Sequence, residues 1–452
     1  MLADDAAPLT PPRQGDQAQR HQGVLSSYSE ENHWGVVTRD DGSKFRFDSS
    51  HLECSVPYEG EVLTFNVGRD KGGRAEARSI RRPSFPQSTG DVIAWNVDPG
   101  SSQANGSIAP ADGTQAVPFT GQDLIRTRAP SGRIVYPRPW HAARFSTIKL
   151  KGGITRAVDV QLDWRFPLYR FAYLPDETAM INELKTLALD ERWDYRSSPT
   201  KKPFEILHNY LHFTFAKLVD EDRGAAPEGR KIRTRTDLKG RSSLSTFNTG
   251  LVDKRYDPIF ALFEANDPGR QPSWKFSAFC IPGQDEGKLL SQYFNPLPTP
   301  PQYFTSTVEL LYDPDAPLHP DYTHILSENR DRLPPDLLKL VAHLPVQKAE
   351  NTLKMHVDRA IDLARKRSRW NFKAAIPHYF PTLKRLDFLL PLCLLDDTTV
   401  DVALAVQRTE TGYLGNTLLP LDWAYKSARL VCRPDSDWLA PERIDAQDFD
   451  PE

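Results

Sequence analysis

One stretch near the start of the chain, residues 23–48, constrains the fold more than any other. Its apolar and polar residues alternate on either side of Asp41-Gly42, a dipeptide typical of tight hairpin turns. Period-two alternation places every second side chain on the same face of a strand. The stretch therefore predicts a β-hairpin with one buried face.

The aromatic residues of this stretch indicate what the hairpin could do. The rings are Tyr28, Trp34, Phe45 and Phe47, and polar residues separate them. A sheet face of rings flanked by charge can stack unpaired bases, and each stacked base contributes about 1–3 kcal/mol. The alternative is that rings such as Phe45 and Phe47 form the interior of a barrel, and the sequence leaves both interpretations open for these two residues.

The motifs of this region resemble those of a cold-shock domain. Residues 32–37 correspond to the K-G-F-G-F-I motif of that family, and residues 45–48 correspond to V-F-V-H. Residues 59–62 and 71–75 match the later E-G-x-x-V and K-G-x-x-A signatures. The resemblance spans about residues 19–82. It implies a five-stranded OB-type barrel that binds single-stranded nucleic acid.

The resemblance also implies a set of nucleic-acid-binding residues. They are Tyr28, His33, Trp34, Phe45, Phe47, Lys71 and Arg74. Two positions depart from the family pattern, because Asn32 replaces the usual lysine and Asp48 replaces the usual histidine. These changes remove one cation and one ring, so we expect a modest affinity. RNA is the expected strand, but the sequence does not distinguish RNA from DNA.

An internal repeat follows the first module. Residues 90–95 have the pattern of residues 23–28, and residues 106–113 have the pattern of residues 35–42 at equal spacing. The repeat predicts a second, degenerate cold-shock-like barrel over residues 88–162.

The second repeat has lost most of its stacking rings. Asn105 stands where the first repeat has Trp34, and Ala116 stands near the position of Phe45. A structural or docking role is therefore favoured over a second base-binding face.

Composition and charge exclude several classes of protein. The chain has 452 residues and a formal net charge of -3, so a binding site for nucleic acid must be a local patch. Cys54, Cys280, Cys393 and Cys432 lack metal-ligand spacing, and the N-terminus has no signal-peptide pattern. We expect a protein of the reducing cytoplasm. The longest apolar run, residues 388–395, is too short to span a bilayer.

The fold class that we predict is multidomain, with two small all-β OB-type barrels followed by a larger α+β domain. The expected organisation is a disordered tail at 1–18, a cold-shock domain at 19–82, the degenerate barrel at 88–162, the α+β domain at 163–440 and an acidic tail at 441–452.

A helix predicted over residues 204–218 carries His208 and His212 one turn apart. Two histidines at this spacing can share a metal ion, but the glutamate of a hydrolytic zinc motif does not follow His208. Because the sequence shows no third ligand, we interpret the pair as ordinary surface or partly buried histidines and predict no metal site.

The C-terminal part resembles a domain of unknown function that is often found behind cold-shock or other RNA-binding modules. Residues 247–251, 365–380, 389–394 and 421–439 carry this resemblance, which covers about residues 164–439. It implies no reaction, because no activity of the domain is established.

Two hypotheses of function follow. In the first, the chain binds single-stranded RNA or DNA, with the large domain as a further RNA-contacting unit and no membrane involved. The basic stretch 365–373, interleaved with Trp370 and Phe372, suits such a contact. In the second, the large domain is an RNA-processing enzyme (end repair, ligation or cleavage), with magnesium and ATP as its cofactors.

The enzyme hypothesis needs a reactive set of side chains. Arginine and lysine could stabilise phosphoryl charge, aspartate could act as a base or bind a metal, and a tyrosine could position a base. The tentative catalytic residues are Asn248, Thr249, Arg369, Asn371, Lys373, Asp422, Tyr425, Arg429, Arg433 and Asp435. No nucleophilic triad, P-loop or metal-ligand cluster with recognised spacing is present, so binding is favoured.

Overall fold

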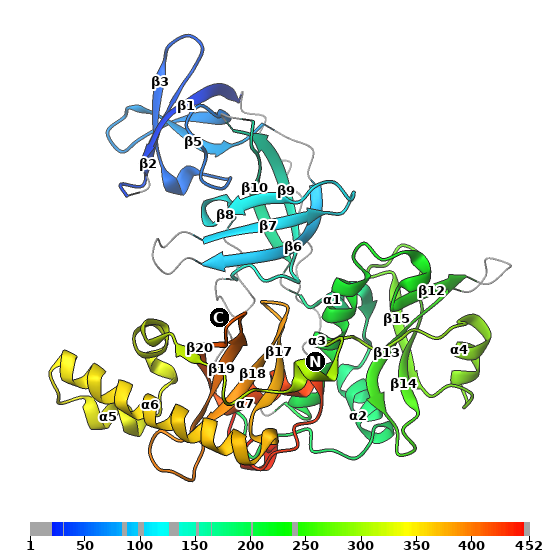
Figure 1. The fold of residues 1–452 in the computed structure, drawn as a ribbon. Helices are drawn as coiled ribbons and strands as arrows, with labels where there is room; N and C mark the ends of the chain where they lie inside the picture. Colours follow the sequence, from blue (N-terminus) through cyan, green and yellow to red (C-terminus); the bar gives the residue numbers. More distant parts are fainter. Residues whose placement is uncertain are drawn as a thin grey trace. The chain divides into compact units, whose positions relative to one another are not determined.

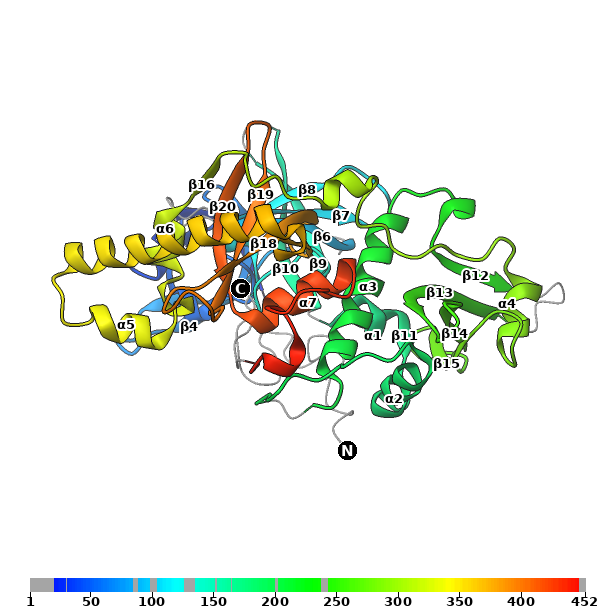
Figure 2. The same cartoon turned by 60° about the horizontal axis from the view of Figure 1, so that its bottom comes forward.

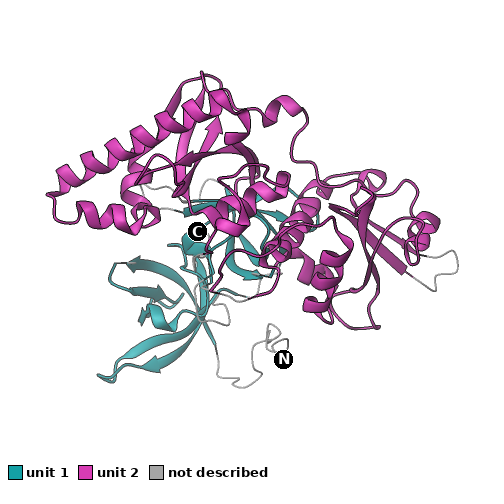
Figure 3. Ribbon diagram, turned by 90° about the horizontal axis from the view of Figure 1, so that it is seen from below, with its two compact units in different colours: residues 1–165 teal, residues 166–452 magenta. Residues whose placement is uncertain are grey.

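The computed structural model describes residues 20–29, 31–83, 88–97, 104–125, 135–150, 153–163, 165–199, 202–236 and 243–446. The chain divides into two compact units, residues 1–165 and residues 166–452 (Figure 3). The predicted disordered tail at 1–18 lies outside the described residues. Within the described ranges, no helix has the length and apolar character needed to cross a membrane.

The first unit begins with a closed five-stranded barrel in the order β1-β2-β3-β5-β4 (Figure 1). Its strands are β1 (His21–Ser29), β2 (Trp34–Thr38), β3 (Lys44–Asp48), β4 (Val62–Arg69) and β5 (Ala75–Arg81). The predicted hairpin is confirmed as β2 and β3. In its turn, Gly42 has a φ of +83° and the Asp41 carboxylate accepts a hydrogen bond from the Ser43 amide at 2.9 Å.

A second barrel-like sheet repeats this strand order as β10-β9-β6-β7-β8. Its strands are β6 (Ser88–Val97), β7 (Ala104–Pro110), β8 (Val117–Thr120), β9 (Ala142–Lys149) and β10 (Thr155–Asp163). The registers agree as well, because Gly35 pairs with Phe47 in the first barrel and Gly106 pairs with Phe119 in the second barrel-like sheet. The sequence repeat thus corresponds to a repeat of topology.

A buried arginine joins the two parts of the first unit. The Arg82 guanidinium follows β5 and donates hydrogen bonds to Glu61 at 2.9 Å and to Asp159 of β10 at 2.6 Å. The Tyr58 hydroxyl adds a hydrogen bond to Asp123 at 2.8 Å. A charge-assisted contact at this depth is costly to break, because removal of one partner leaves the other charge buried.

The second unit consists of two halves with the same topology. In each half a short edge strand runs parallel to the last strand of a four-stranded antiparallel meander. The first half contains α1 (Pro167–Phe171), β11 (Ala172–Tyr173), α2 (Glu177–Leu187), α3 (Glu205–Asp222), β12 (Ile232–Thr236), β13 (Ser243–Val252), β14 (Pro258–Ala265), β15 (Trp274–Cys280) and α4 (Gly287–Tyr293). The second half contains β16 (Leu318–Pro320), α5 (Pro335–Val341), α6 (Val346–Trp370), β17 (Ile376–Phe380), β18 (Arg385–Leu392), β19 (Val402–Arg408), β20 (Tyr413–Leu419) and α7 (Leu421–Val431).

Helices cover both faces of each sheet in the second unit (Figure 2). The alternation along β18 shows this, since Leu389 packs on the side of α7, whereas Phe388 and Leu390 pack on the side of α5 and α6. Helix α3 covers the first sheet and contacts α7. The hydrophobic core between α3 and α7 therefore joins the two halves of the second unit, and the buried face of α3 packs in it.

Candidate functional site

The predicted base-stacking rings of the first barrel lie in two different environments. Phe45 and Phe47 are only 8% and 1% exposed and belong to the barrel core. Gly35 makes room for this packing, because a Cβ atom there would come within 2.5 Å of the Phe47 ring. These two phenylalanines therefore take the interior alternative that the sequence left open, and they offer no surface for stacking.

The outer face of β2 and β3 carries Trp34 and Arg46. Trp34 is partly exposed, and the Arg46 guanidinium carbon lies 4.3 Å from the centroid of the indole ring. Within the described parts of the chain, Arg46 makes no ion pair. Lys44 and His33, which flank these two residues in sequence, are exposed. The face thus combines one indole with cations and with the exposed carboxylate of Asp48, which pairs with Trp34 in register.

The other predicted binding residues of the barrel lie beside this face or in a turn. Tyr28 is partly buried, and its ring stacks on Phe47 at a centroid distance of 6.1 Å. Lys71 and Arg74 are exposed in the turn between β4 and β5. The Asp70 carboxylate holds that turn by accepting the Arg74 amide hydrogen bond at 2.8 Å.

Asn248 and Thr249, from the tentative catalytic set, shape the backbone of β13. The Asn248 carboxamide oxygen accepts a hydrogen bond from the Gly250 amide at 2.9 Å, and the Thr249 hydroxyl donates one to the Ile259 carbonyl at 2.8 Å. Gly250 has a φ of +74°, and a Cβ atom there would lie 2.6 Å from the Tyr210 hydroxyl. Both side chains are buried and serve this irregular stretch of strand.

A second subset of the catalytic candidates surrounds Glu191. Arg429 donates hydrogen bonds to the two Glu191 carboxylate oxygens at 2.7 and 2.9 Å, and the Tyr425 hydroxyl contacts the same group at 3.4 Å. The backbone carbonyl of Asp422 accepts a hydrogen bond from the Tyr195 hydroxyl at 2.9 Å. Asp422, Tyr425 and Arg429 are all buried, as in a structural network.

The remaining candidates lie around the C-terminal end of α6. Arg369 pairs with Asp315 at 2.8 Å, and Lys373 forms an ion pair with Asp435. Asn371 caps the turn that follows α6 by accepting the Lys373 amide hydrogen bond, and Arg433 is exposed. Tyr210 connects the first two subsets, because its hydroxyl donates a hydrogen bond to the Thr249 carbonyl at 3.1 Å and its ring centroid lies 4.7 Å from the Arg429 guanidinium carbon. Among the described residues, these two subsets form buried networks, whereas the candidates at the end of α6 are exposed.

A polar cluster that the sequence analysis missed lies between α1, α2 and α3. Glu177 Oε1 is 2.7 Å from His208 Nε2, 3.0 Å from His212 Nε2 and 2.6 Å from the Tyr169 hydroxyl. The Lys202 ammonium lies 2.6 Å from His208 Nε2 and 3.8 Å from the Glu177 carboxylate. Glu177, His208 and His212 bring their donor atoms within 4.8 Å of one another.

Local structure fixes each member of this cluster. Asp176 caps α2 by accepting the Ala179 amide hydrogen bond at 2.9 Å, which places Glu177 in the first turn of the helix. Phe204 precedes α3 with a φ of +54°, and the Asp194 carboxylate accepts its amide hydrogen bond at 2.6 Å. The Asp194 carboxylate therefore holds the start of α3, and with it His208.

Burial and hydrogen bonding shift the pKa values of Glu177, His212 and Lys202. Burial raises the pKa of Glu177, but hydrogen bonds from His208 and His212 outweigh it and hold that pKa well below its usual range. Burial lowers the pKa of His212 to about 4. Burial also lowers the pKa of Lys202, although nearby carboxylates oppose the shift. Glu177 is thus ionised and His212 is neutral near pH 7.

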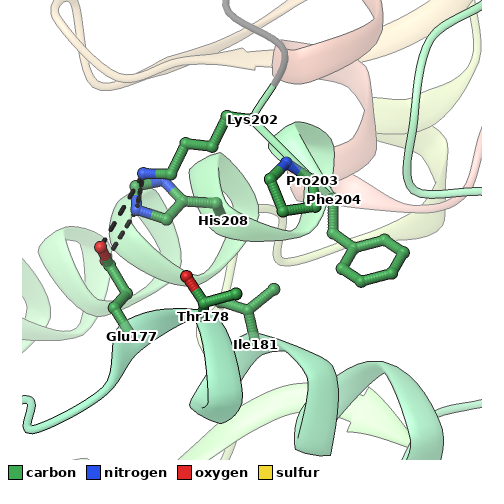
Figure 4. A pocket seen from close by; sticks show the side chains of 7 residues that line it. All are labelled: Glu177, Thr178, Ile181, Lys202, Pro203, Phe204 and His208. Carbon is green, nitrogen blue, oxygen red and sulfur yellow. Dashed lines mark hydrogen bonds and ion pairs between the residues drawn. The ribbon is translucent and has the colours of Figure 1, made fainter. Parts of the chain in front are cut away.

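A shallow pocket opens beside this cluster (Figure 4). Glu177, Lys202 and His208 supply its polar side, and Ile181 and Phe204 are among its apolar lining residues. His212 is fully buried behind them. Solvent can therefore reach Glu177 and His208 but not His212.

Only one part of this cluster could be predicted from the sequence. The spacing of His208 and His212 on one helix was visible. Glu177 lies 31 residues before His208 on another helix, so no spacing rule connects them. Only the packing of α2 against α3 brings the carboxylate to the histidines.

Comparisons with solved structures found distant likenesses. One is Drosophila Unr CSD456, with 11% sequence identity, a TM-score of 0.20, and coverage of 58% of this chain and 96% of that chain. Another is a multidomain protein with nucleic acid binding domains from Streptococcus pneumoniae, with 14% identity, a TM-score of 0.15, and coverage of 49% and 74%. Both TM-scores are too low for these likenesses to bear on function.

A search of curated proteins found no match. The large C-terminal domain, in contrast, matches a known family over residues 184–438, which confirms the predicted resemblance to a domain of unknown function. Since this match covers more than half of the sequence, the chain belongs to the family described as domain of unknown function (DUF3825).

Proposed function

We propose that this protein binds single-stranded nucleic acid, with the outer face of β2 and β3 as the base-stacking surface. The observation that carries the proposal is the pair formed by Trp34 and Arg46, at 4.3 Å from guanidinium carbon to ring centroid. An exposed cation–π contact contributes about 0.5–1 kcal/mol, whereas a stacked base contributes about 1–3 kcal/mol. A base can therefore displace Arg46 from the indole and leave the guanidinium for a phosphate.

Exposed cations around this face supply the electrostatic part of binding. Lys44 and Arg46 lie on β3, and the parallel pairing of Arg46 with Glu76 places the beginning of β5 beside them. Lys71 and Arg74 precede β5 in the adjoining turn. Since the whole chain has a net charge of -3, this local set is what would attract phosphates, and the affinity should fall as salt rises.

The end of α6 is the second contact that we propose, in the large domain. Trp370 is 93% exposed and Phe372 is 65% exposed, which is unusual for rings of this size. Several neighbouring cations are already paired, including Lys366 with Asp362 and Arg369 with Asp315. This place therefore offers stacking more than charge, and it would add to the affinity of the barrel without being sufficient alone.

The expected strand is RNA, and DNA is the comparison that tests this choice. A processing activity is not part of the proposal, because most of the side chains that were expected to carry it are buried in networks or paired at the surface. Binding needs only the face already described.

The test is the affinity of the full chain for fluorescent RNA and DNA strands of the same sequence, and for the RNA duplex, by fluorescence anisotropy. Trp34→Asn should weaken single-strand binding by about 1–3 kcal/mol, or about 5- to 150-fold, through loss of a stacked base. Phe45 is left intact because its ring is part of the core.

The matched control is Asn105→Ala, at the equivalent position of the second barrel-like sheet, which should leave the affinity unchanged. Equal affinities of the wild-type protein and a folded Trp34→Asn variant would refute the stacking surface. Tighter binding of the duplex than of the single strand would refute the proposed class of ligand.

A further inference from the structure

We propose that Glu177, His208 and His212 bind one divalent transition-metal ion of the zinc type. Two imidazoles and one carboxylate are the protein ligands of many catalytic zinc sites, which keep a further position for water or substrate. The same ligand set suits other divalent transition metals. The three residues come from two helices whose relative position the packed core fixes, with His208 and His212 one turn apart on α3.

The spacing of the donor atoms fits such an ion after a small adjustment. Glu177 Oε1 lies 2.7 Å from His208 Nε2 and 3.0 Å from His212 Nε2. In a tetrahedral zinc site with bonds of about 2.0–2.2 Å, neighbouring donor atoms lie about 3.3 Å apart. The Glu177 oxygen and the two histidine nitrogens would have to move apart by about 0.3–0.6 Å, and all three donor atoms already lie within 4.8 Å of one another.

A neutral His208 imidazole cannot form good hydrogen bonds to both of the close polar neighbours of its Nε2 atom. Its Nε2 atom has the Lys202 ammonium at 2.6 Å and the Glu177 carboxylate at 2.7 Å. A neutral imidazole nitrogen either donates or accepts. If it donates to Glu177, its hydrogen faces the ammonium; if it accepts from Lys202, its lone pair faces the carboxylate oxygen. A metal ion between Nε2 and the carboxylate removes this conflict, because both groups then offer lone pairs to the same cation.

The surroundings resemble a site with one open side. His212 is covered by the rings of Phe166 and Tyr169, at centroid distances of 5.0 and 4.6 Å. The Tyr169 hydroxyl donates a hydrogen bond to Glu177 Oε1 at 2.6 Å and would orient the carboxylate as an outer partner. On the other side, Glu177 and His208 line the pocket, from which a water molecule could reach the ion (Figure 4).

The first experiment uses the wild-type full chain, stripped with a chelator and titrated with Co²⁺ and, separately, Zn²⁺. We expect one equivalent of Co²⁺ to bind with the visible absorption of a low-coordinate site that contains nitrogen ligands. Zn²⁺ should abolish this absorption by displacing the Co²⁺. If the folded wild-type protein binds neither ion, the proposal is wrong, whatever the variants do.

Variants then locate the site. His212→Asn and Glu177→Gln should each weaken Zn²⁺ binding by more than about a hundredfold, beyond the 10- to 100-fold that loss of an outer partner costs. Tyr169→Phe should fall within that smaller range. The matched control is His343→Asn, an exposed histidine of the same unit, which should bind as the wild type does. Equal affinities for the control and the ligand variants would overturn the assignment.

Lys202→Met separates a metal site from a plain hydrogen-bonded network. The ammonium group competes with an ion for His208 and repels it, so its removal should tighten Zn²⁺ binding. If Lys202 only serves a network, its removal leaves Zn²⁺ affinity unchanged or weaker, and that result would count against the site. Circular dichroism of each variant confirms that the fold is retained before the titration is interpreted.

Discussion

The first barrel and the second barrel-like sheet share their inward positions and differ in their outward ones. Gly35 and Gly106 occupy the same register position, and the rings that pack against them are Phe47 and Phe119. At the outward positions Trp34, Val36, Arg46 and Asp48 correspond to Asn105, Ser107, Pro118 and Thr120. The inward residues are therefore similar because both sheets need them for packing. The outward residues differ, so a difference in function can arise there.

The first barrel and the second barrel-like sheet also have an equivalent aromatic contact on their inward side. Tyr28 stacks on Phe47 at 6.1 Å, and Trp95 stacks on Phe119 at 5.2 Å. Trp95 therefore occupies a packing position and is no substitute for Trp34. The loss of Trp34 and Arg46 equivalents leaves the second barrel-like sheet without the proposed stacking pair, although its architecture is retained.

The largest expected effect comes from removing Arg82, whose buried ion pairs connect the first barrel to the second barrel-like sheet. Arg82→Met would leave Glu61 and Asp159 without their buried cation, and loss of one partner of such a network costs about 3–5 kcal/mol. Hydrogen–deuterium exchange of the full chain should show lost protection in β5 and β10. Arg78→Met, which removes an exposed pair with Glu76, is the control and should change protection little. Equal protection in both variants would mean that the buried pair does not hold the parts together.

Gly35 and Gly106 should be equally sensitive to an added side chain, because each packs against a buried phenylalanine ring. Gly35→Ala would place a Cβ atom 2.5 Å from the Phe47 ring, and Gly106→Ala would place one 2.8 Å from the Phe119 ring. Each change should cost about 1–3 kcal/mol through overpacking and should raise amide exchange in its own hairpin. Gly121→Ala is the control, because its nearest neighbouring atom lies 3.8 Å away. A large effect at one glycine and none at the other would break the comparison.

The smallest expected effect comes from replacing Arg46, which has no cationic equivalent on the outer face of the second barrel-like sheet. Arg46→Gln should weaken single-strand binding, because the guanidinium that a base displaces from Trp34 is no longer there to contact a phosphate. The effect should be small, because in the variant a base no longer has to break a cation–π contact of about 0.5–1 kcal/mol. The slope of log K against log salt should become shallower by about one. Anisotropy titrations over a series of salt concentrations measure both quantities. A weaker affinity with an unchanged slope would assign Arg46 to orienting the indole only.

Local pattern predicted much of the fold. The period-two hairpin, the internal repeat and helix α3 all follow from spacing along the chain. The resemblance of residues 45–48 to the cold-shock motif V-F-V-H also predicts which side chains of β3 face inward. Phe45 and Phe47 stand at the valine positions of V-F-V-H, and Arg46 stands at the phenylalanine position. Position-by-position comparison would have placed both phenylalanines inside and Arg46 outside, as their burial shows.

Tertiary contacts between distant segments could not be predicted in this way. Arg429 meets Glu191 across 238 residues, and Glu177 meets His208 and His212 from another helix. Strand β12 has no apolar alternation that would mark it as a strand, because it lies at an edge of the sheet and its side chains are partly or fully exposed. Such features depend on which elements pack together, and the spacing of residues along a single sequence does not reveal that packing.

The most direct measurement is photo-crosslinking of the full chain to a uridine-rich RNA strand, with mass spectrometry of the adducts. Crosslinks within β2 and β3, at or beside Trp34, are expected, with a weaker set around Trp370 and Phe372. The peptides of β7 and β8, which have the same topology without the indole, should carry none. Adducts only in β7 and β8, or no adducts in either hairpin, would contradict a base-stacking face on the first barrel.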